Sequence, residues 1–315
     1  QTMGAHTQTG LVCCAHIDDY IKDVIKKHEL TRKDKEDDRT KHTATINANI
    51  GPVFIAYRDV PEIRAALAPI PKQSAPLYDF VDELQVRHQV WPVANAAAIE
   101  KLFAEKVPVS YIADGHHRSA SAVRVGAERR AANPKHTGNE EYNWFLSVLF
   151  PASELKILPY NRAVKDLNGL SQEEFLKEIR AIFTVQENAD PSPKSPRNVS
   201  MYLGGKWYGL SWPAVKSSNP VDLLDVSTLQ NGVLHPLLGI DDPRTNNRIK
   251  FIGGIRGPQE LVRLVDQKGY AVAFSMYPTT VDQLMAIADA GQIMPPKSTW
   301  FEPKLRTGLL SHELA

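Results

Sequence analysis

The chain has 315 residues, of which 43% are hydrophobic and 23% are charged, and its formal net charge is +1. A chain of this length can build one large or two modest hydrophobic cores, and its composition is that of a soluble globular protein. A charge this close to zero argues against wrapping by nucleic acid. No apolar run reaches membrane-spanning length, so no membrane contact is expected either.

The cysteine content and the N-terminus indicate the cellular setting. The two cysteines, Cys13 and Cys14, are adjacent and are not expected to form a structural disulfide, which favours a reducing, cytoplasmic location. The polar N-terminus has no signal-peptide pattern and begins with Gln1 instead of Met. We therefore expect a clipped or partial chain.

A helix is predicted first, over Ile17–His28, because apolar residues recur there at helical spacing. Glu29 follows at its end. The densely charged run over 31–42 is typical of a solvated helix face. In a functional interpretation of the same residues, Glu29 serves as a general base and Arg39 or His42 contacts phosphate.

Short strands and helices then alternate, which indicates a mixed α/β fold. Strands are predicted at 53–57, 77–80 and 83–90, and helices at 61–68 and 95–105.

The most informative motif is Asp114-Gly-His-His-Arg118, which lies between an apolar strand at 107–113 and an amphipathic helix that extends to about Ala132. The first N–H groups of a helix have no internal partner and the helix dipole is positive there, so this turn suits a phosphate. Asp114 can cap the helix or bind a metal ion, and Gly115 lets the backbone approach a ligand closely. His116, His117 and Arg118 add imidazole and guanidinium groups.

A zinc site is the main alternative for this motif. Neighbouring imidazoles point in different directions at a helix start, and the sequence has no His-Glu-x-x-His run or spaced cysteine pair to complete a tetrahedral shell. A structural role, with Asp114 as an ordinary cap and a histidine in packing, is the other alternative.

A second α/β region follows the motif. Strands are predicted at 143–150, 157–162, 199–203, 206–212 and 270–276, and helices at 171–183, 258–268 and 280–290. Gly204-Gly205 predicts a hairpin, and the Pro/Ser-rich segment 188–198 predicts an exposed loop. The Gly pairs of this region lack the third glycine of a dinucleotide fingerprint.

The C-terminal segment 294–306 offers further anion ligands. Lys297, Ser298 and Thr299 place an ammonium group and two hydroxyls in a proline-stiffened loop. A rigid brace, in which Trp300 and Phe301 fill the core and Arg306 is solvated, explains the same residues equally well.

Four segments together resemble the bacterial family called domain of unknown function one-thousand-and-fifteen. They are Lys27-His-Glu-Leu-Thr-Arg32 with the acidic and basic residues up to Arg39, Ile112-Ala-Asp-Gly-His-His-Arg118, Pro159-Tyr-Asn-Arg162, and 294–306. The resemblance covers almost the whole chain. Members usually carry an additional N-terminal segment, which agrees with a truncated chain.

The Asp-Gly-His-His-Arg motif also resembles, locally, the signature of the ParB and sulfiredoxin superfamily, which includes kinases that phosphorylate free L-serine with ADP or ATP. The resemblance implies a ParB/sulfiredoxin-like core over residues 1–155 with a C-terminal α/β region over 156–315. It also implies that Glu29 is the base and that the 114–118 turn holds phosphate. Sulfiredoxin chemistry is disfavoured because its turn carries a cysteine, and DNA segregation because no helix-turn-helix is apparent.

The resulting expectation is a nucleotide-dependent phosphotransferase acting on a small hydroxyl metabolite such as L-serine, with ATP or ADP and Mg²⁺. Glu29, Asp114, His116 and His117 would be catalytic, with Asp114 on Mg²⁺. The residues expected to bind phosphate or nucleotide are Gly115, Arg118, Arg39, Arg162, Lys297, Ser298, Thr299 and Arg306. Two alternatives remain open: a nucleotide-binding regulatory module without turnover, and a metal-dependent phosphoesterase with His116, His117 and Asp114 as ligands.

Overall fold

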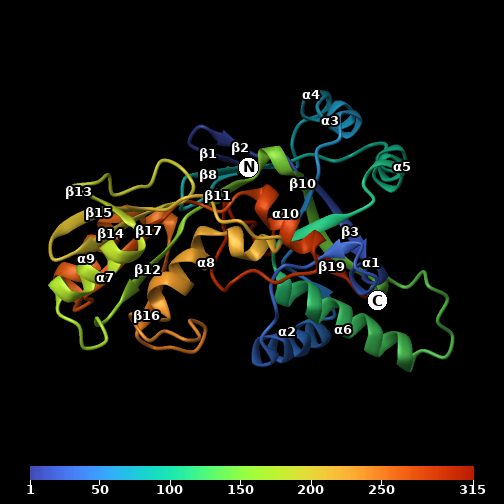
Figure 1. Ribbon diagram of the computed structural model, residues 1–315. Coiled ribbons are helices and arrows are strands. Elements are labelled where there is room, and N and C mark those ends of the chain that lie inside the picture. Colours follow the sequence, from blue (N-terminus) through green and yellow to red (C-terminus); the bar gives the residue numbers. More distant parts are fainter. The chain divides into compact units, whose positions relative to one another are not determined.

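The computed structural model describes residues 1–315 and divides into two compact units (Figure 1). Unit 1 comprises Gln1–Lys156 and Phe301–Ala315, and unit 2 comprises Ile157–Trp300. The division expected from the sequence, 1–155 and 156–315, therefore separates residues 301–315 from the unit to which they belong. These residues are held by β19 (His312–Glu313), which pairs antiparallel with β5 (Ala48–Asn49) of unit 1.

Unit 1 is built on a five-stranded mixed sheet with the order β3-β10-β6-β9-β4. The central strand β6 is antiparallel to β9 and parallel to β10. All five of its residues are buried, as expected for an uninterrupted apolar run. The strands are β3 (Leu11–His16), β4 (Ile25–Lys26), β6 (Val53–Tyr57), β9 (Ser110–Asp114) and β10 (Trp144–Pro151).

Two long helices of unit 1, α2 and α6, lie side by side (Figure 1). The Ser121 hydroxyl of α6 donates to the backbone carbonyl of Glu36 in α2 at 3.2 Å, and Arg124 donates to Asp37 at 2.6 Å. This packing brings one end of the charged helix α2 to the start of α6. The helices of unit 1 are α1 (Ile17–Ile21), α2 (Lys33–Ile46), α3 (Pro61–Leu67), α4 (Ile70–Gln73), α5 (Ala96–Lys106) and α6 (His116–Ala132).

The helix predicted over Ile17–His28 was wrong beyond its first turn. α1 ends at Ile21, Asp23 takes a left-handed backbone conformation with φ 59°, and Ile25 begins β4. Ile25 is buried and pairs in parallel with Ser110 of β9. Sheet pairing thus overrides the helical periodicity, and as a result His28 and Glu29 follow a strand that runs alongside the strand of the motif.

A small antiparallel sheet completes unit 1, in the order β2-β1-β8-β7. Its strands are β1 (Thr2–Met3), β2 (His6–Thr7), β7 (Tyr78–Val81) and β8 (Val86–Val90).

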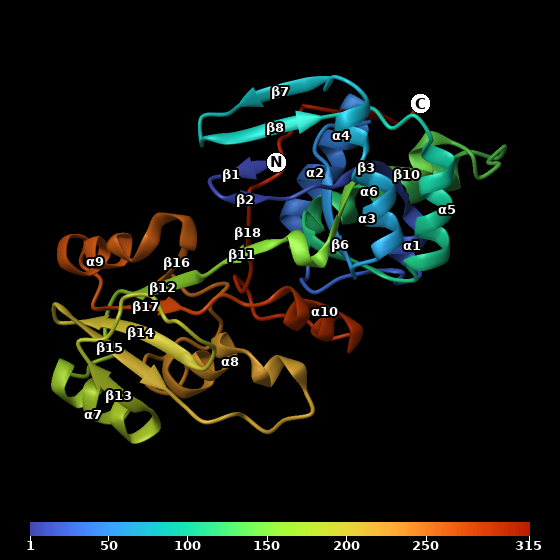
Figure 2. The ribbon, with the colours of Figure 1, turned by 90° about the horizontal axis from the view of Figure 1, so that it is seen from above.

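Unit 2 is a six-stranded antiparallel sheet with helices on both faces. Figure 2 shows α9 on one face and α7 and α8 on the other. The predicted hairpin at Gly204-Gly205 is confirmed, since Leu203 pairs with Lys206. The strands, in sheet order, are β13 (Thr184–Glu187), β15 (Lys206–Ser211), β14 (Asn198–Leu203), β17 (Val272–Met276), β12 (Tyr160–Val164) and β16 (Ile249–Gly253).

Two helices of unit 2, α7 and α10, begin at side-chain caps. Side chains of Ser171 and Thr280 form reciprocal capping boxes with Glu174 and Gln283. The helices of unit 2 are α7 (Gln172–Ile182), α8 (Asp225–Leu229), α9 (Gly257–Lys268) and α10 (Val281–Asp289). β11 (Lys156–Leu158) leads from unit 1 into unit 2, and β18 (Trp300–Glu302) leads back.

The mixed α and β class predicted from the sequence is confirmed. None of the helices combines the length and the apolar character that crossing a membrane requires.

Candidate functional site

The candidate site is centred on the turn between β9 and α6. β9 ends at Asp114, Gly115 occupies the position before the helix with φ 101°, and α6 begins at His116. The cap residue is a glycine and makes no side-chain hydrogen bond to the helix start. The start of this 17-residue helix therefore presents backbone N–H groups and the positive end of the helix dipole to an anion.

A cavity of about 370 Å³ opens at this turn, and all of its walls belong to unit 1. Glu29, Arg39 and the whole of Asp114–Arg118 line it, so the structure brings these expected residues together. Lys35 and His42 line the same cavity. With Arg39, they lie on one face of α2, since residues four and seven apart share a helix face. Arg39 and His42 were already named from the sequence as possible phosphate contacts, and the same spacing along the helix could have identified Lys35, which was missed.

Asp114 and Arg118 form the charged floor of this cavity. The Asp114 carboxylate lies 3.5 Å from the Arg118 guanidinium and 3.8 Å from the Lys304 ammonium. The Nε atom of Arg118 is buried and has no hydrogen-bond partner. Arg118 thus has a donor in reserve beside the open helix start, and leaving such a buried donor unpaired costs about 1–3 kcal/mol.

The two motif histidines point to different partners. The backbone N–H of Arg32 donates to Nε2 of His117 at 3.0 Å, which leaves Nδ1 of that ring as the donor and ties the start of α2 to the start of α6. His116 instead turns into the protein and is only 5% exposed.

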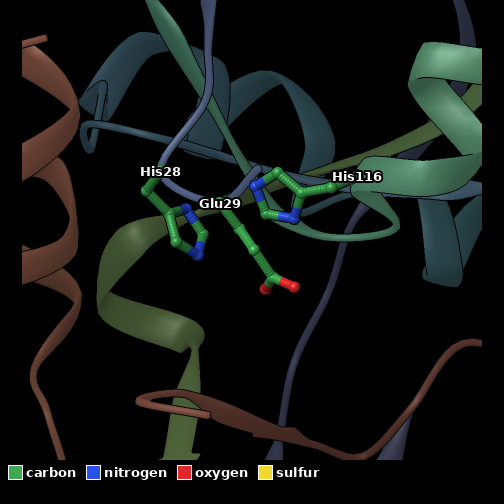
Figure 3. Close-up of side chains that lie close together, drawn as sticks. All are labelled: His28, Glu29 and His116. Carbon is green, nitrogen blue, oxygen red and sulfur yellow. The ribbon is translucent and has the colours of Figure 1, made fainter. Parts of the chain in front are cut away.

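His116 packs edge to face on His28, with ring centroids 4.5 Å apart and an interplanar angle of 88° (Figure 3). Burial, with smaller contributions from His28 and His117, holds the pKa of His116 well below its usual value. Burial likewise lowers the pKa of His28 to about 4. Burial thus disfavours the imidazolium form of His116, so a role of His116 at the phosphate would be that of a neutral ring.

The phosphoesterase ligand set of His116, His117 and Asp114 is not assembled either. Nε2 of His117 already accepts the Arg32 N–H, and Asp114 does not belong to the cluster of ligand atoms around His116. The carboxylate that joins His116 is Glu29, together with His28 (Figure 3). His28 was missed in the sequence because it was assigned to a helix.

Several C-terminal residues do not join this cavity. Arg306 lies in unit 1 but pairs with Glu83 at 2.8 Å and Asp82 at 3.5 Å, and it lines a different, mostly apolar cavity of about 460 Å³. Its expected role at the phosphate is therefore wrong, because its guanidinium is held by the hairpin of β7 and β8.

Arg162, Lys297, Ser298 and Thr299 belong to unit 2. Arg162 is 3% exposed and donates to the backbone carbonyls of Tyr160 and Lys297. Burial lowers the pKa of Arg162 to about 10, so it stays charged. The Ser298 hydroxyl donates to the carbonyl of Pro295 at 2.6 Å. Arg162 and Ser298 thus fix the 295–298 loop, and phosphate binding there is not needed to explain them.

A family model described as Protein of unknown function (DUF1015) matches residues 1–227. No curated protein matches the sequence.

Three solved structures to which this chain is similar share little sequence with it. A mutant of free serine kinase in complex with AMP is 13% identical, covers 96% of this chain and 91% of its own, and has a TM-score of 0.47. Another mutant of that kinase, in complex with ADP, is 15% identical over 94% of this chain and 89% of its own, with a TM-score of 0.45. SbnI with a C-terminal truncation, from Staphylococcus aureus, is 10% identical over 94% and 85%, with a TM-score of 0.49.

Proposed function

The chain belongs to the family described as Protein of unknown function (DUF1015), and we propose that it is a nucleotide-dependent phosphotransferase acting on a small hydroxyl metabolite such as L-serine. The observation that carries the proposal is the cavity at the start of α6, which is lined by the first residues of that helix and by Arg118. The backbone N–H groups of a helix start and a guanidinium match the oxygens of a phosphate.

The cavity also carries the charges that a phosphoryl transfer needs. Lys35, Arg39 and Arg118 supply positive charge, and the exposed Glu29 supplies a carboxylate at the same wall. Such chemistry depends mainly on positioning and electrostatics and needs no covalent nucleophile.

In the proposed reaction, Glu29 accepts the proton of the acceptor hydroxyl as its oxygen bonds to the terminal phosphorus of ATP or ADP. The bond from that phosphorus to the bridging oxygen breaks, so the products are a phosphomonoester and the nucleotide shortened by one phosphate. Arg118 and the N–H groups of α6 bind the transferred group, and Lys35 and Arg39 neutralise the remaining phosphates.

Magnesium fits this site through Asp114. Mg²⁺ is usually held by one or two carboxylates together with phosphate oxygens and water, and Asp114 provides one half-exposed carboxylate at the cavity wall. When bound, the ion would neutralise charge on the phosphates. His117 would act as a neutral donor through Nδ1.

The test is phosphorus NMR of the protein with ATP or ADP, Mg²⁺ and a pool of hydroxyl compounds that includes L-serine. A new phosphomonoester signal is expected, and Glu29→Gln should slow its appearance by about 10²- to 10⁴-fold while nucleotide still binds. Glu128→Gln is the matched control, because Glu128 is exposed on α6 and pairs with Arg124 at 3.1 Å.

A second pair of variants tests the phosphate contacts. Arg118→Gln should weaken ADP binding by about 10- to 100-fold, as expected for a lost charge-assisted contact. Arg124→Gln on the same helix should bind ADP normally, because Arg124 pairs with Asp37 and Glu128. Nucleotide binding without any product would instead indicate a regulatory module, and free phosphate as the sole product a hydrolase.

A further inference from the structure

His28, Glu29 and His116 form a cluster that the proposed phosphate chemistry does not explain. One potential ligand atom from each side chain lies within 4.8 Å of the others (Figure 3). His28 and Glu29 follow β4, and His116 opens α6, so two neighbouring strands of the central sheet deliver the three side chains to one place. Glu29 and His116 also line the cavity at the α6 start.

Two ring nitrogens in this cluster are buried without a partner. Nδ1 of His28 and Nε2 of His116 have no hydrogen bond, although the residues are only 2% and 5% exposed. Each such atom costs about 1–3 kcal/mol if nothing satisfies it. The edge-to-face packing of the rings does not satisfy either nitrogen.

The backbone of Ile112 in β9 lies beside the His28 ring and favours a proton on it, against the larger effect of burial, which lowers the pKa of His28 to about 4. Nδ1 of His28 has no hydrogen-bond partner, so the neutral tautomer protonated at Nε2 leaves a lone pair on Nδ1. A backbone carbonyl that orients a histidine through its second nitrogen is the usual support of a metal-binding imidazole.

We propose that one ring nitrogen of His28, one ring nitrogen of His116 and the Glu29 carboxylate bind one divalent transition-metal ion of the Zn²⁺ class. Two imidazoles and one carboxylate are a donor set that suits such ions, whereas Mg²⁺ prefers oxygen ligands. Three protein ligands leave at least one coordination position open. Because Glu29 and His116 line the cavity at the α6 start, a phosphate oxygen or hydroxyl bound in that cavity would be the candidate for the open position.

This metal site goes beyond the proposed transfer reaction and does not depend on it. It differs from the Mg²⁺ position at Asp114 in all of its ligands. It is also compatible with Glu29 as a base, because a carboxylate that binds a metal through one oxygen retains lone pairs on the other. Glu29 is exposed and can rotate to close the remaining distance.

The test is titration of the chelator-treated protein with Zn²⁺ by calorimetry and with Co²⁺ by visible absorption. Wild type should bind one equivalent of either ion, give Co²⁺ d–d bands of a nitrogen- and oxygen-ligated site, and melt at a higher temperature with Zn²⁺. His116→Ala and His28→Ala should weaken Zn²⁺ binding at least 100-fold. The control His42→Ala should bind like wild type, because His42 lines the same cavity from α2 without joining the cluster.

His28 and His116 are buried, so a variant at an exposed ligand is needed to separate loss of Zn²⁺ binding from misfolding. Glu29→Gln alters an exposed side chain, so it should fold normally and still weaken Zn²⁺ binding by about tenfold or more. Absence of stoichiometric Zn²⁺ and Co²⁺ binding in wild type would overturn the proposal, and so would unchanged affinity in folded His116→Ala and Glu29→Gln. Phosphate transfer is measured separately, with chelator-treated protein to which only Mg²⁺ has been added. Failure of either proposal therefore does not affect the other.

Discussion

Replacement of Gly115 by alanine tests whether the motif glycine positions Arg118. At φ 101° the backbone is strained for any residue with a Cβ, and this strain costs about 1–3 kcal/mol. Loss of backbone freedom in the unfolded chain offsets about 0.4–1 kcal/mol of that cost. We therefore expect the free energy of unfolding to fall by about 1–2 kcal/mol.

The added Cβ has a second effect, which is local. It would lie 2.9 Å from Nη2 and 3.1 Å from Nε of Arg118. Both atoms are at the far end of a flexible side chain, so the guanidinium moves away and the fold survives. Because a hydrogen bond to a charged group contributes about 1.5–3 kcal/mol, ADP affinity should fall by about 10- to 100-fold.

Gly138→Ala is the matched control. Gly138 has nearly the same backbone, with φ 98°, but an added Cβ there meets nothing within 4 Å. Urea unfolding should show similar destabilisation in the two variants, whereas calorimetric titration with ADP should show weakened binding only for Gly115→Ala. Equal ADP affinity in both variants would refute the assignment of Arg118 to phosphate.

Three further predictions concern stability and reactivity. Gly126→Ala should lower the free energy of unfolding, measured by urea denaturation, by about 2 kcal/mol or more. Alanine favours helices, but its Cβ would lie 2.4 Å from the Tyr142 carbonyl oxygen. A more stable variant would contradict this packing. Burial raises the pKa of Cys13 to about 12 and that of Cys14 to about 11, so both thiols should react with a disulfide reagent at pH 8 far more slowly in the native protein than in urea. Burial also raises the pKa of Asp225 to about 6, so the folded chain holds this proton more tightly than the unfolded chain. Wild type should therefore lose stability relative to Asp225→Asn as the pH rises from about 4 to about 6. Parallel profiles of unfolding free energy against pH for the two proteins would exclude the effect.

The sequence by itself determined the local features of this protein. The strand, glycine turn and helix around 110–132 depend on an apolar run, a residue that tolerates positive φ and helical spacing, all of which are encoded within a few residues. The same holds for the hairpin at Gly204-Gly205 and for the capped helices of unit 2. The choice of the 114–118 turn as an anion site also needed no more than this local information.

Tertiary structure decided which distant residues meet this turn. The segment after Ile21 has helical periodicity, yet it forms β4 because pairing with β9 buries Ile25. That pairing alone brings His28 to His116, 88 residues later in the chain. Contacts between residues so far apart depend on strand order and helix packing, which no local propensity encodes. The same reason explains why the ion pair between Arg306 and Glu83 was not predicted, because it depends on residues 301–315 packing in unit 1.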